Sequence, residues 1–259
     1  MAQNDDFGSI FGAEFLGQLF VEGVFDIGVG IGYYWICQAR ILRKRVICTN
    51  IIMFGPPGAG KGTRAGMIRE MYGIPHVSSG DLLRAEIKKG NDLGNAAKIF
   101  MDAGELVPDL FVFYLIEKRL KEEDCKNGVI FDGFPRNKMQ CNWMERNGYS
   151  VDFVLNIPIG DEEVVERLGG RRACGNCGAI YHVVNIPPKV EGVCDECGSG
   201  LIIRDDDKPD VIRDRLKVYR AQTAPVLEEL EKSYKISELS ARNTAEAERQ
   251  ILEILGSPC

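Results

Sequence analysis

The stretch Phe54-Gly55-Pro56-Pro57-Gly58-Ala59-Gly60-Lys61-Gly62-Thr63 decides how this chain folds. An apolar segment at 50–54 precedes it, and a helix-like stretch from about residue 61 to 71 follows it. Glycines between a strand and a helix let backbone N–H groups converge on one point, where the helix N-terminus adds partial positive charge. Lys61 brings a full positive charge to the same point. The stretch therefore predicts a phosphate-binding loop (P-loop) for a nucleotide polyphosphate, although the simple pattern has Ser or Thr directly after the lysine and Gly62 intervenes here.

The composition is that of an ordinary globular protein. The chain has 259 residues, is 45% hydrophobic and 27% charged, and carries a net charge of −6. This length suits one large α/β domain or a core with small insertions. The negative charge argues against broad nucleic-acid binding, which depends on a basic surface. Because the chain opens with acidic residues (Asp5, Asp6), no cleavable secretory signal is evident, and the nine cysteines are expected to be free or metal-bound thiols in a reducing cytoplasm.

From residue 50 onward, short apolar runs alternate with helical periods. Strands are expected at 50–54, 76–78, 128–132, 151–157 and 235–239. Helices are expected at 80–89, 110–123, 161–167, 210–234 and 244–255. This alternation predicts a three-layer α/β fold, a parallel sheet with helices on both faces. Catalytic groups in such sheets lie at the carboxyl ends of strands, which is where Gly55 and Asp132 fall.

Four cysteines, Cys174, Cys177, Cys194 and Cys197, form two C-x₂-C pairs separated by residues 178–193. This is the spacing of a four-thiolate zinc site. Four thiolates close the coordination shell, so the metal is expected to be structural and not a Lewis acid. Free thiols, two disulfides, or iron in place of zinc remain alternatives.

Residues 1–49 differ from the rest of the chain. The segment 7–37 is glycine-rich and apolar, and polar residues recur at every fourth position from Glu14 to Asp26, which on a helix gives one narrow polar stripe. A basic cluster follows at 40–45. Three interpretations stay open: a membrane span with the basic cluster on the cytoplasmic side, a helix that packs against protein through self-association, and a poorly ordered or artefactual extension. Acidic residues near the middle of the segment oppose the membrane span.

Several motifs in one order resemble the adenylate kinase family, in its form with a long lid and a four-cysteine zinc site. The motifs are Gly55–Thr63, Ser79-Gly80-Asp81-Leu82-Leu83-Arg84, Met101-Asp102-Ala103-Gly104-Glu105-Leu106-Val107, Asp132-Gly133-Phe134-Pro135-Arg136, Gly170-Arg171-Arg172 and Arg204-Asp205-Asp206-Asp207. The likeness covers about residues 50–255. It implies a P-loop fold and a reversible, Mg²⁺-dependent transfer of a phosphoryl group between ATP and AMP that gives two ADP, with small-molecule nucleotides and no nucleic acid as partners.

The resemblance also implies a division of the chain. The P-loop core would comprise residues 50–78, 109–170 and 209–259. Residues 79–108 would form a helical AMP-binding insertion, and residues 171–208 would form a lid like a zinc ribbon, stapled by the metal. Residues 1–49 have no counterpart in the family pattern, so their role stays open.

Roles for individual residues follow from the same resemblance. The ATP site would comprise Gly58, Ala59, Gly60, Lys61, Gly62, Thr63, Arg167 and Arg171. The AMP site would comprise Ser79, Gly80, Arg84, Gly104, Glu105, Val107, Gly133, Arg136, Gln140, Arg204 and Arg215. The catalytic set would be Lys61, Arg136, Arg171, Arg204 and Arg215, with Asp132 and its helper Asp81 associated with Mg²⁺ and the four cysteines with structural Zn²⁺. Phosphoryl transfer requires alignment of two anions and charge stabilisation of the group in flight, which is what such an arginine set supplies.

The chain departs from the family pattern in one further place. The aspartate-glycine pair that usually follows the last strand is absent from 236–243, so the adenine contacts of ATP are left unassigned there. Another nucleoside monophosphate kinase, acting on UMP or CMP, remains an alternative, as does a non-catalytic zinc-ribbon protein that binds nucleotides. The long lid and Gln140 favour AMP. Asp206 and Asp207 are expected to pair with arginines and to help hold the lid closed.

Overall fold

The computed structural model describes residues 49–241 and 243–258. The predictions for the segment 7–37 lie outside these residues. None of the helices within the described ranges is long and apolar enough to cross a membrane.

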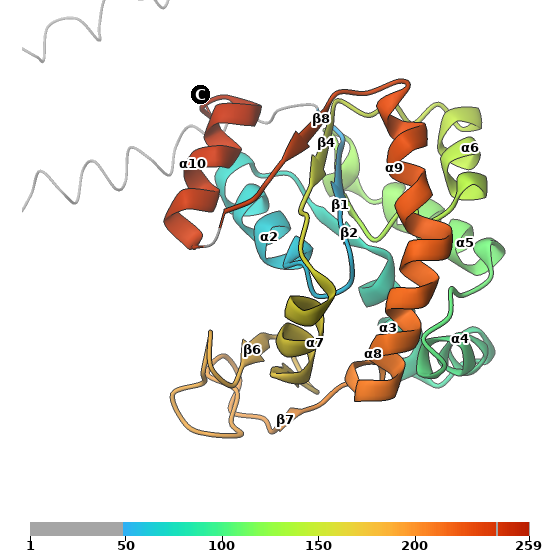
Figure 1. Cartoon of the computed structure of the whole chain (residues 1–259). Helices are drawn as coiled ribbons and strands as arrows, with labels where there is room; N and C mark the ends of the chain where they lie inside the picture. The colour runs from blue at the N-terminus through green and yellow to red at the C-terminus, as the bar shows by residue number, and fades with distance from the viewer. Residues whose placement is uncertain (1–48, 242, 259) are drawn as a thin grey trace, which may run out of the picture. The chain divides into compact units, whose positions relative to one another are not determined.

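A parallel sheet of five strands forms the centre of the fold (Figure 1). The strands are β1 (Ile51–Phe54), β2 (His76–Ser78), β3 (Ile130–Asp132), β4 (Phe153–Asn156) and β8 (Ile236–Glu238). They lie in the order β2-β3-β1-β4-β8, and every neighbouring pair is parallel. All four residues of β1 are buried, as expected of a central strand that is covered on both faces. The carboxyl ends of all five strands therefore meet at one edge of the sheet.

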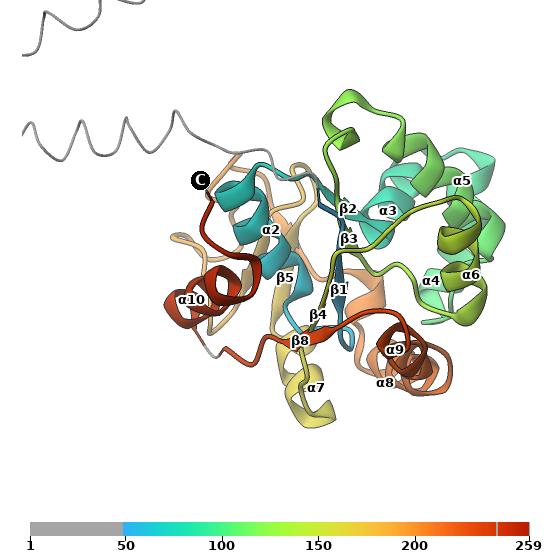
Figure 2. The same ribbon diagram turned by 90° about the horizontal axis from the view of Figure 1, so that it is seen from above.

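Helices cover both faces of the sheet, which confirms the predicted three-layer architecture (Figures 1 and 2). The helices α2 (Lys61–Tyr72) and α10 (Thr244–Leu255) lie on one face, and α5 (Asp109–Leu120), α6 (Lys138–Arg146) and α9 (Ala224–Glu231) lie on the other. Side chains of β1 alternate between the two cores. Ile51 and Met53 pack with the α2 side, whereas Ile52 and Phe54 pack with the α5 side.

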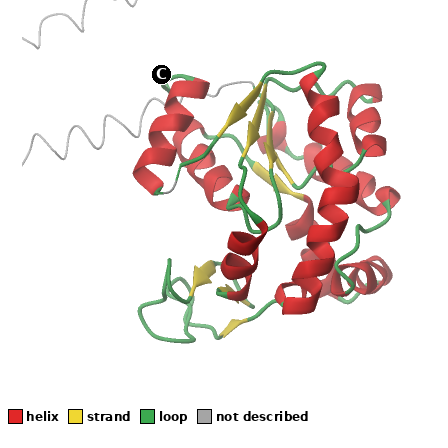
Figure 3. Ribbon diagram, viewed as in Figure 1, coloured by secondary structure: helices red, strands yellow, loops and turns green. Residues whose placement is uncertain are grey.

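Two insertions extend from the carboxyl edge of the sheet. Helices α3 (Ser79–Lys89) and α4 (Asp92–Asp102) follow β2 directly. Farther along the chain, α7 (Asp161–Gly169) leads into a separate antiparallel sheet of β5 (Arg171–Cys174), β6 (Ile180–His182) and β7 (Leu201–Ile202), in the order β6-β5-β7. Figure 3 shows this small sheet beyond the end of the main one. A 3₁₀ turn (Asp205–Asp207) and α8 (Pro209–Val218) lead the chain back to the core.

The observed elements agree with most of those predicted. The strands of the main sheet are shorter than predicted, except β2, which has the predicted bounds. The helices α4 and α6 and the three lid strands were not predicted. The helical stretch expected over 210–234 is observed over 209–231, with a π-helical turn at Tyr219–Thr223 between α8 and α9. Pro225 follows this turn, and its ring has no N–H to continue the i→i−4 ladder of hydrogen bonds.

Asparagine side chains begin three of the helices. At the N-termini of α4, α6 and α10, an Asn Oδ1 accepts a hydrogen bond from the backbone N–H three residues later. The pairs are Asn91 with Gly94 (2.7 Å), Asn137 with Gln140 (2.9 Å) and Asn243 with Glu246 (2.9 Å). Each cap satisfies a backbone donor that the helix itself leaves unpaired.

We expect Gly94→Ala to destabilise the protein, because α3 and α4 pack closely at this glycine. A Cβ at position 94 would lie 2.2 Å from the carbonyl oxygen of Glu86. Backbone cannot yield as a flexible side chain would, so the free energy of unfolding should fall by about 1–3 kcal/mol. Urea denaturation followed by circular dichroism measures the change.

Gly66→Ala on α2 is the matched control, since a Cβ there would meet nothing within 4 Å. Alanine in an open helical position should raise the free energy of unfolding by about 0.5–1 kcal/mol. Equal effects of the two substitutions would contradict the packing described for α3 and α4.

Candidate active site

A cleft of about 1220 Å³ lies at the carboxyl edge of the parallel sheet. Its walls come from the P-loop, the insertion after β2, the lid and α8. Of the residues predicted to contact a nucleotide, Ala59 is fully buried, and all the others line this cleft. The structure therefore brings together in one place residues that the sequence separates by more than 150 positions.

The P-loop has the backbone conformation that its glycines predict. Gly55, Gly58 and Gly60 adopt φ values of 136°, 79° and 88°, which side chains with a Cβ rarely adopt. The Lys61 ammonium group donates hydrogen bonds to the carbonyl oxygens of Gly55 (2.7 Å) and Pro56 (2.8 Å). Burial lowers the pKa of Lys61 to about 8, with nearby arginines acting in the same direction and Asp132 opposing them. The loop thus holds a cation that has lost much of its water, which strengthens its attraction to a phosphate.

Asp132 lies at the end of β3, beside the P-loop lysine. Its carboxylate is 13% exposed, and its Oδ2 lies 3.1 Å from Nε2 of His76. Burial alone would raise the pKa of Asp132, but the hydrogen bond from His76 and the charge of Lys61 outweigh burial and lower it. Asp132 is therefore an anion, and its second oxygen, Oδ1, does not take part in the contact with His76. Sequence reasoning missed His76, whose partnership with Asp132 follows only from the parallel pairing of β2 with β3.

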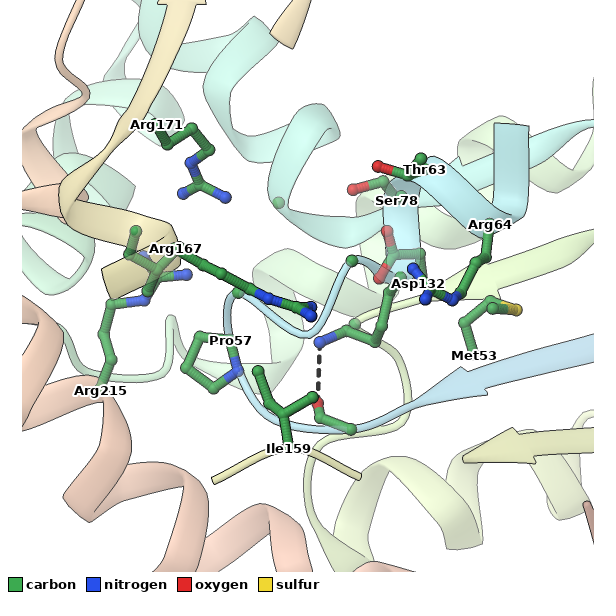
Figure 4. A pocket seen from close by; sticks show the side chains of 18 of the residues that line it. Met53, Pro57, Thr63, Arg64, Ser78, Asp132, Ile159, Arg167, Arg171 and Arg215 are labelled. Carbon is green, nitrogen blue, oxygen red and sulfur yellow. Dashed lines mark hydrogen bonds between the residues drawn. The ribbon is translucent and has the colours of Figure 1, made fainter. Parts of the chain in front are cut away.

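Arginines from several elements surround the same space (Figure 4). The side chains of Arg167 on α7, Arg171 on β5 and Arg215 on α8 reach toward the P-loop. Burial lowers the pKa of Arg136 to about 10, and Arg215 adds to this effect. Burial likewise lowers the pKa of Arg204 to about 10, with Arg84 and Arg171 as further causes. A cluster of partly desolvated guanidinium groups at this density attracts polyanions.

Two aspartates hold this cluster together. The fully buried Asp207 carboxylate accepts a bidentate pair of hydrogen bonds from Arg171 and lies 3.3 Å from Arg215. Asp206 lies 3.1 Å from Arg215 and 3.7 Å from Arg84. The expectation that both aspartates pair with arginines is confirmed. These pairs join the 3₁₀ turn (Asp205–Asp207) to α3 and α8.

The part of the cleft wall that follows β3 is held by several hydrogen bonds. Ser79 Oγ and Arg136 Nε both donate to the carbonyl oxygen of Gly133, at 2.6 and 2.7 Å. The Gln140 side chain, 2% exposed, accepts from the backbone N–H of Arg136 and donates to Asp109, both at 2.7 Å. Beyond these two contacts, the Gln140 amide keeps one acceptor lone pair and one donor hydrogen. Gln140 therefore fixes the Arg136 backbone while lining the cleft.

Asp81 and Gly104, which were predicted to contact Mg²⁺ and AMP, also contact other parts of the protein. Asp81 accepts a hydrogen bond of 2.6 Å from Arg84, and the charge of Arg84 helps to lower the pKa of Asp81 against the opposing effect of burial. Gly104 packs against α8, where a Cβ would lie 3.0 Å from the carbonyl oxygen of Val211. This close approach places the insertion after β2 directly beside the helix that carries Arg215.

The lid cysteines converge as their spacing predicts. The Sγ atoms of Cys174, Cys177, Cys194 and Cys197 all lie within 4.8 Å of one another. Tetrahedral zinc–thiolate bonds of about 2.3 Å would separate the sulfurs by about 3.8 Å, and the closest observed pairs are 3.5 Å apart. The four residues therefore fit a tetrahedral metal ion bound entirely by sulfur.

The metal-ligand loops also contact the insertion after β2. Lys88 on α3 donates to the carbonyl oxygens of Gly175 (3.4 Å) and Asn176 (3.1 Å), which lie between the first two cysteines. Lys98 on α4 lies 3.3 Å from Asp205. These contacts of Lys88 and Lys98 join the two insertions.

The parallel sheet, the P-loop at the end of its central strand and the arginine-lined cleft define a nucleotide-binding protein of the P-loop class. The family model for adenylate kinase matches residues 53–235. The chain belongs to the adenylate kinase family.

Individual relatives agree with this assignment. An adenylate kinase of Lachnospira eligens is 53% identical over 183 residues, which cover 69% of this chain and 86% of that protein. An adenylate kinase of Caldicellulosiruptor saccharolyticus is 44% identical over 212 residues, covering 80% of this chain and 99% of that protein. An adenylate kinase of the archaeon Archaeoglobus fulgidus is 46% identical over 183 residues, covering 69% and 84%. Each shared region covers more than two thirds of this chain.

We expect Cys194→Ser to remove most of the bound metal. Losing one of four thiolates opens the coordination shell, so metal content should fall well below one ion per chain, and the melting temperature should drop by roughly 5–10 °C. Elemental analysis by mass spectrometry and differential scanning calorimetry on one sample measure both quantities.

Cys141→Ala is the control, since Cys141 is a buried thiol that is not part of the cluster. It should keep the full metal content. A Cys194→Ser protein with unchanged metal content and melting temperature would show that the cluster is not a structural metal site.

Proposed function

We propose that the chain catalyses the reversible, Mg²⁺-dependent transfer of a phosphoryl group from ATP to AMP, which yields two ADP. The observation that carries this proposal is one cleft lined by cationic groups from separate elements. Lys61 comes from the P-loop, Arg84 from α3 and Arg136 from the loop after β3, and Asp132 lies beside the lysine. The volume of the cleft, about 1220 Å³, exceeds the roughly 300–1,000 Å³ that is usual for one small ligand. Two nucleotides placed with their phosphates facing each other account for both the volume and the charge.

The P-loop end would hold ATP. The backbone N–H groups of residues 58–63 would surround the phosphates, and Lys61 would exchange its contacts with Gly55 and Pro56 for phosphate oxygens. Arg167 and Arg171 approach this end from α7 and β5 (Figure 4). Their planar forks suit the terminal phosphate groups.

The opposite end would hold AMP. Arg84 and Arg136 would grip its phosphate, and Gln140 would offer its remaining donor and acceptor to the base. The other residues proposed for this subsite are Ser79, Gly80, Gly104, Glu105, Val107 and Gly133. In this arrangement a phosphate oxygen of AMP faces the γ-phosphorus of ATP.

Arg171, Arg204 and Arg215 would stabilise the group in flight, because Arg171 and Arg204 come from the lid, Arg215 comes from α8, and all three line the cleft. In this structure Asp206 and Asp207 bind arginines of this set. Phosphate oxygens would compete for the same donors when nucleotides bind. The donors are thus oriented before the reaction, which is the condition for strong electrostatic stabilisation.

Asp132 fits the role of holding Mg²⁺ or its water ligands. It is anionic, and one of its oxygens lies outside the contact with His76. Hard cations prefer such carboxylate oxygens. When bound, Mg²⁺ would neutralise charge on the ATP phosphates. Asp81 is a further candidate, although Arg84 already engages one of its oxygens.

The two insertions would act as moving covers. Residues 79–108 would close over AMP, and residues 171–208, stapled by Zn²⁺ on the four cysteines, would close over ATP. Their contacts in this structure, Lys88 with the metal-ligand loop and Arg84 with Asp206, support closure of one against the other. Closure would exclude water, so that AMP and not water receives the phosphoryl group.

An acceptor panel tests the proposed function. Purified protein with ATP and Mg²⁺ should form ADP rapidly with AMP, and at least about 100-fold more slowly with UMP, CMP or GMP, because the buried Gln140 matches an adenine edge. ADP formation without any acceptor should be negligible. Preference for UMP or CMP would instead identify a different nucleoside monophosphate kinase, and nucleotide binding without turnover would identify a non-catalytic binding protein.

The pH profile should report Lys61. The folded protein disfavours the charged lysine and lowers its pKa to about 8, so Lys61 loses its proton at a lower pH than in an unfolded chain. Since kcat/KM reports ionisation of the free enzyme, kcat/KM for ATP should fall as pH rises through about 8. Initial rates between about pH 7 and 9.5 cover this range.

Lys61→Arg is the matched variant, because guanidinium keeps its charge across this range. Whatever its absolute rate, its profile should lack the decline near pH 8. The same decline in both proteins would assign it to another group.

A further inference from the structure

Arg64 lies in the first turn of α2, three residues after the P-loop lysine, and lines the cleft. The phosphate-loop pattern gives it no role. Its Nη2 donates a hydrogen bond of 2.6 Å to the carbonyl oxygen of Ala241, a residue 177 positions away that follows β8. In Figure 4 the Arg64 side chain lies on the opposite side of the view from Arg215. This bond joins the helix that begins at the P-loop to the far end of the chain.

The Arg64 guanidinium is also pressed against the P-loop. A Cβ on Gly60 would lie only 2.7 Å from Arg64 Nη1. Arg64 Nε is buried and has no hydrogen-bond partner. Burial and the charge of Arg167 lower the pKa of Arg64. The Arg64 guanidinium is thus held between the P-loop and the segment that follows β8.

The segment that Arg64 holds lines the same cleft. Ser240, Ala241 and Asn243 all contribute to the cleft wall. Leu239 anchors the start of this segment, since it is fully buried and its N–H donates to Asn156 (2.8 Å). The segment lacks the aspartate-glycine pair that the resemblance leads one to expect.

One arginine side chain therefore spans the distance from the P-loop to this segment. Both the P-loop and this segment line the same cleft. A nucleotide with its phosphates on the P-loop would place its base against the backbone near Ala241. Backbone N–H and C=O groups held at fixed positions can distinguish adenine from guanine by their opposite donor and acceptor patterns.

We infer that Arg64 is a specificity-determining positioning residue for the nucleotide on the P-loop. It holds the Ala241 backbone where the base would lie. The inference rests on the proposed function, because it takes the P-loop nucleotide to be ATP. The AMP end of the cleft, built on Arg84 and Arg136, does not depend on it.

Equilibrium binding tests this inference without requiring turnover. Titration calorimetry would measure the Kd of the β,γ-imido analogues of ATP and GTP, and of AMP, for the full chain and for Arg64→Met. Methionine keeps much of the apolar stem and removes every donor. We expect the Kd of the ATP analogue to rise about 10-fold and its preference over the GTP analogue to fall by a similar factor, with the Kd of AMP unchanged within about twofold.

Two further variants separate positioning from general damage. Arg64→Lys keeps one donor for Ala241 and should lie between the full chain and Arg64→Met. Arg69→Met changes an exposed arginine on the same helix and should bind all three nucleotides as the full chain does. An unchanged Kd and unchanged preference in Arg64→Met would overturn the inference, as would an equal loss of AMP binding. If the full chain formed no ADP, the proposed function would be contradicted. The binding measurements would still decide the role of Arg64, because they do not require turnover.

Discussion

The structure depends on positive charge held away from water at the carboxyl edge of one sheet. Lys61 and Arg136 both have lowered pKa values, chiefly because burial removes solvent from them. Cations in such a position are costly unless anions compensate them. In this structure the compensation comes from Asp132, Asp206 and Asp207. In the proposed function, phosphate oxygens would compete with these carboxylates for the same cations.

The fold supplies the means to hold these charges. Parallel pairing places Asp132 beside the P-loop, because β1 and β3 are neighbours and end at the same edge. The chain returns from the lid through α8, which presents Arg215 to the cleft and packs against Gly104 in the other insertion. Each charged group thus comes from an element anchored in a different part of the molecule. Movement of either insertion would change the arginine cluster as a whole.

Much of this architecture could be predicted from the sequence, since the strands and the metal-ligand pairs have local signatures. The helices α4 and α6 were missed although Asn91 and Asn137 begin them with ordinary caps. The partnership of His76 with Asp132 could not be predicted, because it requires the strand order. The same holds for Arg64 and Ala241, which only the folded chain brings together. No sequence pattern indicates that half of the hydrogen-bonding capacity of the Gln140 side chain serves the protein itself.

Simultaneous occupancy is the property that distinguishes this account most directly from a single-nucleotide site. Equilibrium dialysis of the protein with Mg²⁺, the β,γ-imido analogue of ATP and AMP, each carrying a different radioactive label, measures the occupancy of both ends at once. We predict that each chain binds one molecule of each nucleotide and that neither nucleotide displaces the other. Displacement of the ATP analogue by AMP, one for one, would show that the cleft holds a single nucleotide and would contradict the account.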